Sequence, residues 1–178
     1  MTTNVNDPRT DAHAQEATVN RSTIGWLFVA VQFALLGALA LLPAGDAWPR
    51  PDWLRALGLA AMAIGLGIVA VAALRLGPAL TATPVPTRRS ALITGGLYRW
   101  ARHPIYAGVL LIVAGVALRS GSLATVGVAI ALVLFFLIKS SWEEQRLRDR
   151  YPDYDRYAAT VGRFGPRLAR RGGRAERH

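Results

Sequence analysis

Hydrophobic residues along this chain are gathered into four long runs that contain no charged side chain. The first two runs extend over residues 24–42 and 56–74, and the last two over residues 104–118 and 121–138. Each of the first two would form a helix roughly 28 Å long, which is about the thickness of the hydrocarbon core of a bilayer. The pattern therefore predicts an all-α, polytopic membrane protein with about four transmembrane helices.

The third and fourth runs are separated by only Arg119 and Ser120. So short a link forces the two helices into a tight antiparallel hairpin. The start of the third helix and the end of the fourth must then lie side by side. At roughly 22 Å the third helix is short for a span, so it tilts little, thins the bilayer locally or starts below the membrane surface.

Small residues recur at helical spacing within all four runs. They are Ala30, Ala34 and Ala38; Ala61 and Gly65; Gly108 and Gly115; and Gly127 and Ala131. Membrane helices associate where small side chains let their backbones approach closely, because lipid supplies no hydrophobic driving force between them. We expect these residues to pack the helices into a compact bundle.

Charged residues are distributed unevenly over the segments between the runs. The segment before residue 24 sums to −1, and the loop over residues 43–55 sums to zero. The loop over residues 75–103 carries five arginines and no acidic residue, and the segment from residue 139 onward sums to +5. By the positive-inside rule, we expect the N-terminus, the basic loop and the C-terminal segment to lie on the cytoplasmic side of the inner (plasma) membrane.

The net charge of +10 does not by itself indicate a nucleic-acid-binding protein. The arginines flank apolar runs, where they serve topology and contact anionic head groups. No soluble segment is long enough to present a groove for a nucleic acid. We therefore expect the membrane, and not a nucleic acid, to be the partner of the basic residues, with residues 167–178 forming a disordered tail on the lipid.

The chain contains no cysteine, which excludes disulfides, thiol catalysis and thiolate metal sites. We expect no bound metal. The first apolar run is long enough to remain as a span and lacks the flanks of a cleavage site, so we also expect no cleaved signal peptide.

The polar segment before the third run has the composition of a binding site. It holds His103, the only histidine outside the two tails, followed by Pro104, a residue that suits the first position of a helix. His103 would then cap the helix, with Tyr106 on nearly the same face, and exposed backbone N–H groups there could hold an anion. Residues 98–100 alone favour an interfacial anchor belt, whereas His103, Pro104, Tyr106 and Gly108 together favour a site.

Two adjacent glutamates, Glu143 and Glu144, follow the fourth run where its helix leaves the membrane. Glu144 and Arg148 have the i,i+4 spacing of a surface ion pair, which explains one carboxylate as helix solubilisation. Glu143 lies closer to the bilayer. Because the hairpin brings the two helix ends together, we expect His103 and Glu143 to come within reach of one charged small molecule at the membrane surface.

Several motifs extend this pattern toward the C-terminus. They are Leu-Ile-Thr-Gly-Gly-Leu-Tyr at 92–98, Arg-His-Pro-x-Tyr-x-Gly at 102–108, Glu-Glu at 143–144, Tyr-Pro-Asp-Tyr at 151–154 and Val-Gly-Arg-Phe-Gly-Pro at 161–166. In combination they resemble the isoprenylcysteine carboxyl methyltransferase and phospholipid N-methyltransferase family of integral membrane methyltransferases. The resemblance covers residues 76–166, about half of the chain.

The resemblance implies that S-adenosylmethionine binds in a cytoplasmic pocket formed by the last hairpin and the C-terminal segment. The cofactor-binding residues that it implies are Tyr98, Arg102, His103, Pro104, Tyr106, Gly108, Glu143 and Glu144. It also places Arg163 near the methyl acceptor, where a guanidinium could orient an anionic group. Arg163 and Glu143 are therefore the catalytic candidates, with Glu143 or His103 as the base if an amine or a thiol must lose a proton.

The function predicted is methyl transfer from S-adenosylmethionine to a lipophilic or membrane-accessible acceptor, with a carboxyl oxygen first and nitrogen or sulfur open. Two alternatives remain: a membrane reductase of the sterol-reductase type using NADPH, and a non-catalytic membrane protein. The glutamate pair suits a sulfonium cofactor with an ammonium better than a polyphosphate. The expected organisation is a polar tail (1–23), two spans (24–75), a cofactor-binding core (76–166) and a basic tail (167–178).

Overall fold

The computed structural model describes residues 8–77 and 92–167 of the chain. Within these ranges the protein consists of five α-helices and a short 3-10 helix, with no β-strand and one isolated bridge between Ala101 and Gly162. The elements are α1 (Pro8–Leu41), α2 (Asp52–Leu76), η2 (Gly96–Arg99), α3 (Pro104–Ser120), α4 (Leu123–Arg150) and α5 (Tyr154–Thr160). The expectations for the loop after residue 77 and for the tail beyond residue 167 fall on residues outside the described ranges.

Two helices extend well beyond the apolar runs that predicted them. Helix α1 begins at Pro8, whose fixed backbone angle suits the first turn, and no further proline or glycine interrupts it before the run at residue 24. Helix α4 continues past Ile138 into a polar segment that ends at Arg150. The polar end of α4 thus projects beyond the apolar run, and it carries both glutamates of the candidate site.

Among the described residues, three helical segments are long and apolar enough to cross a membrane: Thr23–Leu41, Asp52–Leu76 and Leu123–Arg150. Helix α3 is also apolar but has 17 residues, and it is shorter than these three. The protein is therefore a multi-pass, all-helical membrane protein, and the count of four spans stays a prediction. Large apolar side chains are exposed along these helices, as expected for surfaces that face lipid.

The predicted tight hairpin is formed by α3 and α4, but its link is Gly121 and Ser122, because Arg119 and Ser120 belong to the last turn of α3. Gly121 ends α3 with a φ of 63°, a left-handed conformation that glycine adopts without a steric penalty. Ser122 then caps α4 by accepting a hydrogen bond from the Thr125 amide. The loop between α1 and α2 lies against this turn, because Gly45 N donates to Ser120 O at 2.8 Å. The two loops therefore mark one end of the bundle.

Helices α2 and α3 approach each other through glycine contacts. A Cβ built on Gly65 would lie 2.5 Å from the Gly108 carbonyl oxygen, and Gly58 faces Gly115 in the same way. Such close approach of backbones needs residues without side chains. The packing role predicted for Gly65, Gly108 and Gly115 is therefore confirmed. The role predicted for Gly127 is wrong, because a Cβ built there meets no atom within 4 Å, and Ala30 and Ala34 are exposed on α1.

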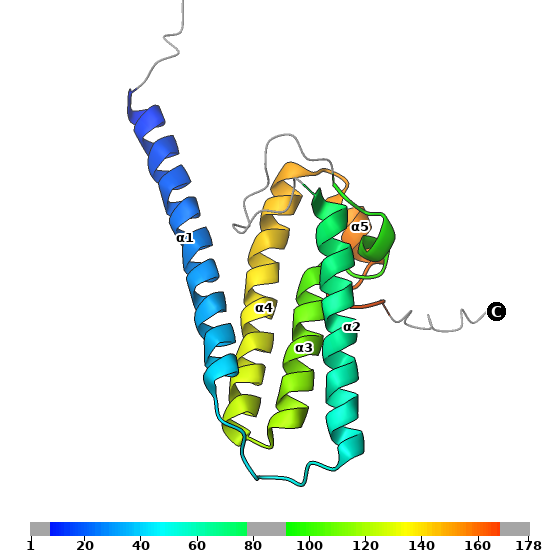
Figure 1. Ribbon diagram of the computed structural model, residues 1–178. Helices are drawn as coiled ribbons and strands as arrows, with labels where there is room; N and C mark the ends of the chain where they lie inside the picture. The colour runs from blue at the N-terminus through cyan, green and yellow to red at the C-terminus, as the bar shows by residue number, and fades with distance from the viewer. Residues whose placement is uncertain (1–7, 78–91, 168–178) are drawn as a thin grey trace, which may run out of the picture.

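The long helices lie in the order α1, α4, α3, α2, so that α4 packs on both α1 and α3, and α3 on both α4 and α2 (Figure 1). The apolar core between α1, α3 and α4 consists of Leu39, Val113, Leu132, Phe135 and Phe136. Phe135 and Phe136 lie in the last apolar turn of α4, so the core ends where the polar part of that helix begins.

The C-terminal segment closes the end of the bundle opposite the two loops. Arg102 N donates to Gly162 O and His103 N donates to Arg163 O, both at 2.9 Å. The Tyr157 hydroxyl of α5 donates to Tyr98 O of η2 at 2.5 Å. These bonds fix the backbone on both sides of His103 and bring Arg163 beside the end of α4.

Candidate active site

Glu144 is the centre of a buried ion-pair cluster at this closed end. It is 1% exposed, although it lies on the polar part of α4. Its Oε1 lies 3.0 Å from Arg102 Nη2, 3.2 Å from His103 Nε2 and 3.2 Å from Arg163 Nε. A buried carboxylate is stable only when such partners replace the water that it has lost.

The surface ion pair expected between Glu144 and Arg148 is a minor part of this arrangement. Arg148 Nη2 lies 3.8 Å from Glu144 Oε2, farther than the three partners from other segments. Glu144 therefore does not serve mainly to solubilise the helix: it ties α3 and the C-terminal segment to α4.

Glu143 has a different set of partners from its neighbour. Its Oε1 accepts a hydrogen bond of 2.6 Å from the Tyr106 hydroxyl, and its Oε2 lies 3.5 Å from His103 Nδ1. The Glu143 side chain is 14% exposed, whereas that of Glu144 is 1% exposed, so Glu143 is the more accessible of the two carboxylates. The expectation that His103 and Glu143 come together is confirmed, and Glu143 is the carboxylate with fewer cationic partners.

His103 lies between the two glutamates. It occupies the N-cap position of α3, with Pro104 at the start of the helix, and its side chain makes no capping bond. The ring instead stacks on Tyr106 at 5.4 Å between centroids and directs one nitrogen to each glutamate. Both nitrogens can donate together only when the ring is protonated. The predicted placement of His103 and Tyr106 on one face of α3 is confirmed.

Two arginines complete the cluster from different segments. Arg102 binds Glu144 and also donates from Nη1 to the carbonyl oxygens of Ala158 and Val161, both at 2.8 Å. Arg163 binds both oxygens of Glu144 and donates from Nη1 to the Ser141 hydroxyl at 3.0 Å. Arg102 is almost enclosed, whereas the Arg163 side chain is 31% exposed. Arg163 is thus the arginine of the cluster that a second molecule can reach.

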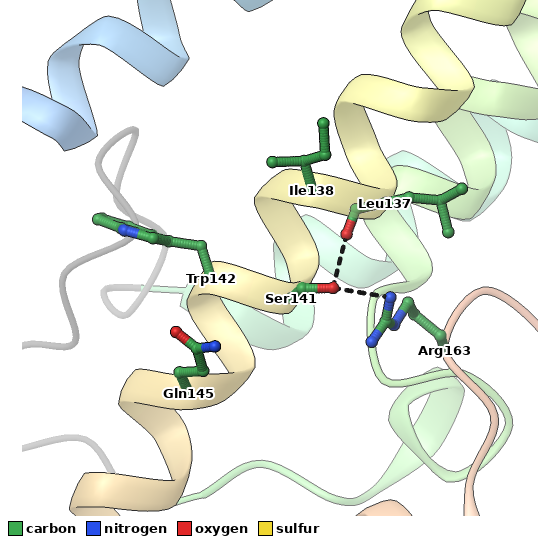
Figure 2. A pocket seen from close by; sticks show the side chains of 6 residues that line it. All are labelled: Leu137, Ile138, Ser141, Trp142, Gln145 and Arg163. Carbon is green, nitrogen blue, oxygen red and sulfur yellow. Dashed lines mark hydrogen bonds between the residues drawn. The ribbon is translucent and has the colours of Figure 1, made fainter.

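A groove of about 430 Å³ runs along α4 beside Arg163. Figure 2 shows the Ser141 hydroxyl between the Leu137 carbonyl oxygen and Arg163, with the other lining side chains arranged along the same helix. The lining residues are Leu137, Ile138, Ser141, Trp142, Gln145 and Arg163. The groove is therefore apolar near the membrane run and polar next to the cluster.

Three of the predicted cofactor-binding residues have structural roles of their own. Pro104 is buried at the start of α3, and Gly108 lies at the contact with α2. Tyr98 is buried in η2 and contacts Tyr157 of α5 through its backbone oxygen. No contact here tests their assignment to a cofactor, which stays a prediction.

Burial raises the pKa of one tyrosine in η2 and of one in α5. Burial raises the pKa of Tyr98 to about 12, and the neighbouring Tyr157 adds to the shift. Burial also raises the pKa of Tyr157 to about 12, although the charge of Arg102 acts in the opposite direction. Both hydroxyls therefore remain protonated at neutral pH, and Tyr157 acts as the hydrogen-bond donor.

The sequence analysis missed two polar residues within the apolar helices. Lys139 directly follows the fourth apolar run, and Gln32 interrupts the first run. The structure joins them by a hydrogen bond of 2.6 Å from Lys139 Nζ to Gln32 Oε1. A polar residue inside a predicted span was the available signal, because such residues are costly unless paired. Among the residues that the structure describes, no group of three or more histidine or acidic side chains could hold a metal ion.

Residues 53–154 match the family model described as phospholipid methyltransferase. The chain belongs to the phospholipid methyltransferase family. The matched range includes Arg102, His103, Tyr106 and both glutamates, whereas α1 and Arg163 lie outside it.

Two curated relatives extend the similarity over most of the chain. The cobalt-zinc-cadmium resistance protein CzcN of Cupriavidus metallidurans is 29% identical over 89% of this chain and 70% of its own length. The nickel-cobalt-cadmium resistance protein NccN of Alcaligenes xylosoxydans xylosoxydans is 27% identical over 86% of this chain and 69% of its own length.

The fold is similar to that of a solved membrane methyltransferase. The eukaryotic intramembrane Ras methyltransferase ICMT (isoprenylcysteine carboxyl methyltransferase) superposes with a TM-score of 0.59 at 23% sequence identity, over 86% of this chain. This chain spans about half of that protein, 53% of its length. At this identity the likeness concerns the fold.

Proposed function

We propose that this protein is an integral membrane methyltransferase that uses S-adenosylmethionine and acts on a lipophilic or membrane-accessible acceptor. Family membership supports the reaction class. The observation that carries the proposal is the cluster of His103, Tyr106 and Glu143 beside an accessible arginine, at the mouth of a groove along a membrane helix.

The side chains present suit the chemical groups of this cofactor. Its ammonium and ribose hydroxyls need acceptors, which the Glu143 carboxylate supplies, and its carboxylate needs donors, which His103 and the arginines supply. The face of the Tyr106 ring offers an aromatic wall for a cation, an interaction of about 0.5–2 kcal/mol. In this assignment Glu144 holds Arg102, His103 and Arg163 in place, and Glu143 contacts the cofactor.

When bound, S-adenosylmethionine supplies an activated methyl group: the acceptor's lone pair forms the new bond to carbon while the methyl–sulfur bond breaks and leaves its electron pair on sulfur. The protein's residues bind and orient both partners, since little covalent assistance is required and positioning contributes most of the rate.

The acceptor is proposed to approach along the groove on α4. Leu137, Ile138 and Trp142 suit the apolar part of an amphiphile, and Arg163 suits an anionic head group. A carboxylate is the acceptor that this arrangement favours, because it reacts without losing a proton. For an amine or a thiol, Glu143 or His103 would accept the proton.

The site is proposed to face the cytoplasm, from the inner (plasma) membrane. The basic residues at the closed end of the bundle support this orientation through the positive-inside rule. The NADPH-dependent reductase alternative is less suited to this chain, because the family model that it matches describes methyltransferases.

Calorimetric titration of the detergent-purified protein tests the proposal. We expect S-adenosylmethionine and its demethylated product to bind with micromolar affinity and NADPH not to bind. His103→Ala and Glu143→Gln should weaken binding, whereas Leu134→Ala, on an exposed side chain of α4, should not. Binding of NADPH alone would assign the protein to the reductases, and absence of all binding would contradict the proposed function.

A further inference from the structure

Lys139 is a buried cation one helical turn before Glu143 on α4. It is 4% exposed, and its Nζ donates to Gln32 Oε1 of α1 at 2.6 Å. The same Nζ lies 5.3 Å from the ring centroid of Tyr106 and 6.0 Å from that of Phe135. The side chain therefore points into the helix bundle and toward the residues of the candidate site.

This orientation differs from that of a basic residue that only anchors a helix in the membrane. A lysine near the end of a span normally extends its ammonium to the water interface, where charge is solvated at low cost. Lys139 is instead held inside by an amide oxygen and two aromatic faces, each of which stabilises a buried cation. Burying this charge costs free energy unless other groups compensate it. Because one of the compensating groups is the Tyr106 ring, Lys139 is linked to the candidate site.

The nearest acidic group on the same face of α4 is Glu143. Residues four apart on a helix lie one above the other, and the positive charge of Lys139 acts electrostatically on the Glu143 carboxylate. The Tyr106 ring beneath the ammonium carries the hydroxyl that donates to Glu143. Lys139 thus contacts one partner of the Tyr106–Glu143 pair and attracts the other.

We propose that Lys139 is a positioning residue of the methyl-transfer site, fixed by Gln32 of α1, that holds Tyr106 and Glu143 in the geometry required for binding. This inference rests on the proposed function. It gives α1 a direct part in a site whose other residues lie on later segments, although α1 precedes the range matched by the family model. Phe28 of α1 adds a second link, because its ring lies 5.1 Å from that of Trp142 in the groove.

Two measurements on the full chain in detergent test this role. The first is a double-mutant cycle in unfolding free energy, without any ligand, for Lys139→Met, Glu143→Gln and the combined variant. We expect the two changes to be non-additive, because each removes one side of the same electrostatic contact. Additive effects would overturn the positioning role.

The second measurement is the affinity for S-adenosylmethionine by calorimetry. We expect Lys139→Met to weaken binding of the cofactor about tenfold and Lys139→Arg, which keeps the charge, to weaken it less. Gln32→Leu should weaken binding more than Gln32→Glu, because glutamate keeps an acceptor oxygen. The lipid-facing Phe33→Leu on α1 is the matched control and should bind as the wild type does.

The outcomes separate this inference from the proposed function. Wild-type affinity in Lys139→Met, or a fall in thermal stability with unchanged affinity, would overturn the inference while the proposed function stands. If the wild-type protein binds no adenosyl compound, the proposed function is overturned, and with it the role of Lys139 in methyl transfer. A non-additive cycle in that case would show only a structural link between Lys139 and Glu143.

Discussion

The Tyr106 hydroxyl donates a hydrogen bond of 2.6 Å to Glu143, joining the first turn of α3 to the polar end of α4 across 37 residues of sequence. The adjacent Glu144 instead binds two arginines and His103. Neighbouring positions on a helix point about 100° apart, so the two carboxylates meet different surroundings. This difference divides the pair into one carboxylate that ties cationic side chains of other segments to α4 and one that contacts a single tyrosine and a single imidazole.

The two glutamates should therefore respond differently to the same substitution. Glu144→Gln removes the charge that compensates Arg102 and Arg163, and breaking a buried pair in this way costs about 3–5 kcal/mol. Glu143→Gln keeps an acceptor for Tyr106 and should destabilise the protein less than Glu144→Gln does, since it loses only the attraction of Lys139 and His103. It also removes the charge proposed to bind an ammonium, worth about 1.5–3 kcal/mol. Unfolding in detergent measures the first effect, and calorimetry with S-adenosylmethionine measures the second. Equal losses of stability in both variants would contradict the division.

The sequence predicted the hairpin and the meeting of His103 with Glu143, because both follow from run lengths and a two-residue link. It did not predict the separate roles of the glutamates, since these depend on the rotation of α4 about its axis. The contact between Gln32 and Lys139 was also beyond prediction, because 107 residues separate them and neither belongs to a motif. Helix α5 has only seven residues, too few to show a helical period.

The glycine contacts between α2 and α3 should be sensitive to a single methyl group. Gly65→Ala places a Cβ 2.5 Å from the Gly108 carbonyl oxygen, so the helices must separate, and we expect a loss of about 1–3 kcal/mol. Gly67→Ala, two residues along the same helix, meets no atom within 4 Å and is the matched control. Thermal unfolding of both purified variants checks the difference. Alanine is the better helix former, so a control that loses as much stability as Gly65→Ala would show that the close contact is not the cause.

Alkaline pH should destabilise the closed end of the bundle. Burial raises the pKa of both Tyr98 and Tyr157 to about 12, whereas a tyrosine in the unfolded chain has a pKa of about 10. Between these values the folded state keeps protons that the unfolded state has lost, so stability is complete below about pH 10 and decreases as pH rises toward about 12. Unfolding measured across this range should show the decrease.

Tyr157→Phe provides the control for the pH dependence. It removes one of the two hydroxyls and its bond to Tyr98 O, at a cost of about 1 kcal/mol at neutral pH. Above about pH 10 its stability should decrease less steeply than that of the wild type. Identical slopes for the two proteins would show that other groups cause the alkaline loss.

The absence of cysteine makes the orientation of the chain directly measurable. The Asp46 loop lies with the α3–α4 turn at one end of the bundle, and Ala159 of α5 lies with the site at the other; both positions are exposed. Single Asp46→Cys and Ala159→Cys variants can be labelled with a membrane-impermeant maleimide in right-side-out and in inverted inner-membrane vesicles. We expect the residue 46 variant to be labelled only in right-side-out vesicles and the residue 159 variant only in inverted ones, because the positive-inside rule predicts that the basic end faces the cytoplasm. The reverse pattern would invert the topology, and labelling of both from one side would show that an even number of the three helices between them crosses the membrane, so that α3, the shortest, does not span it.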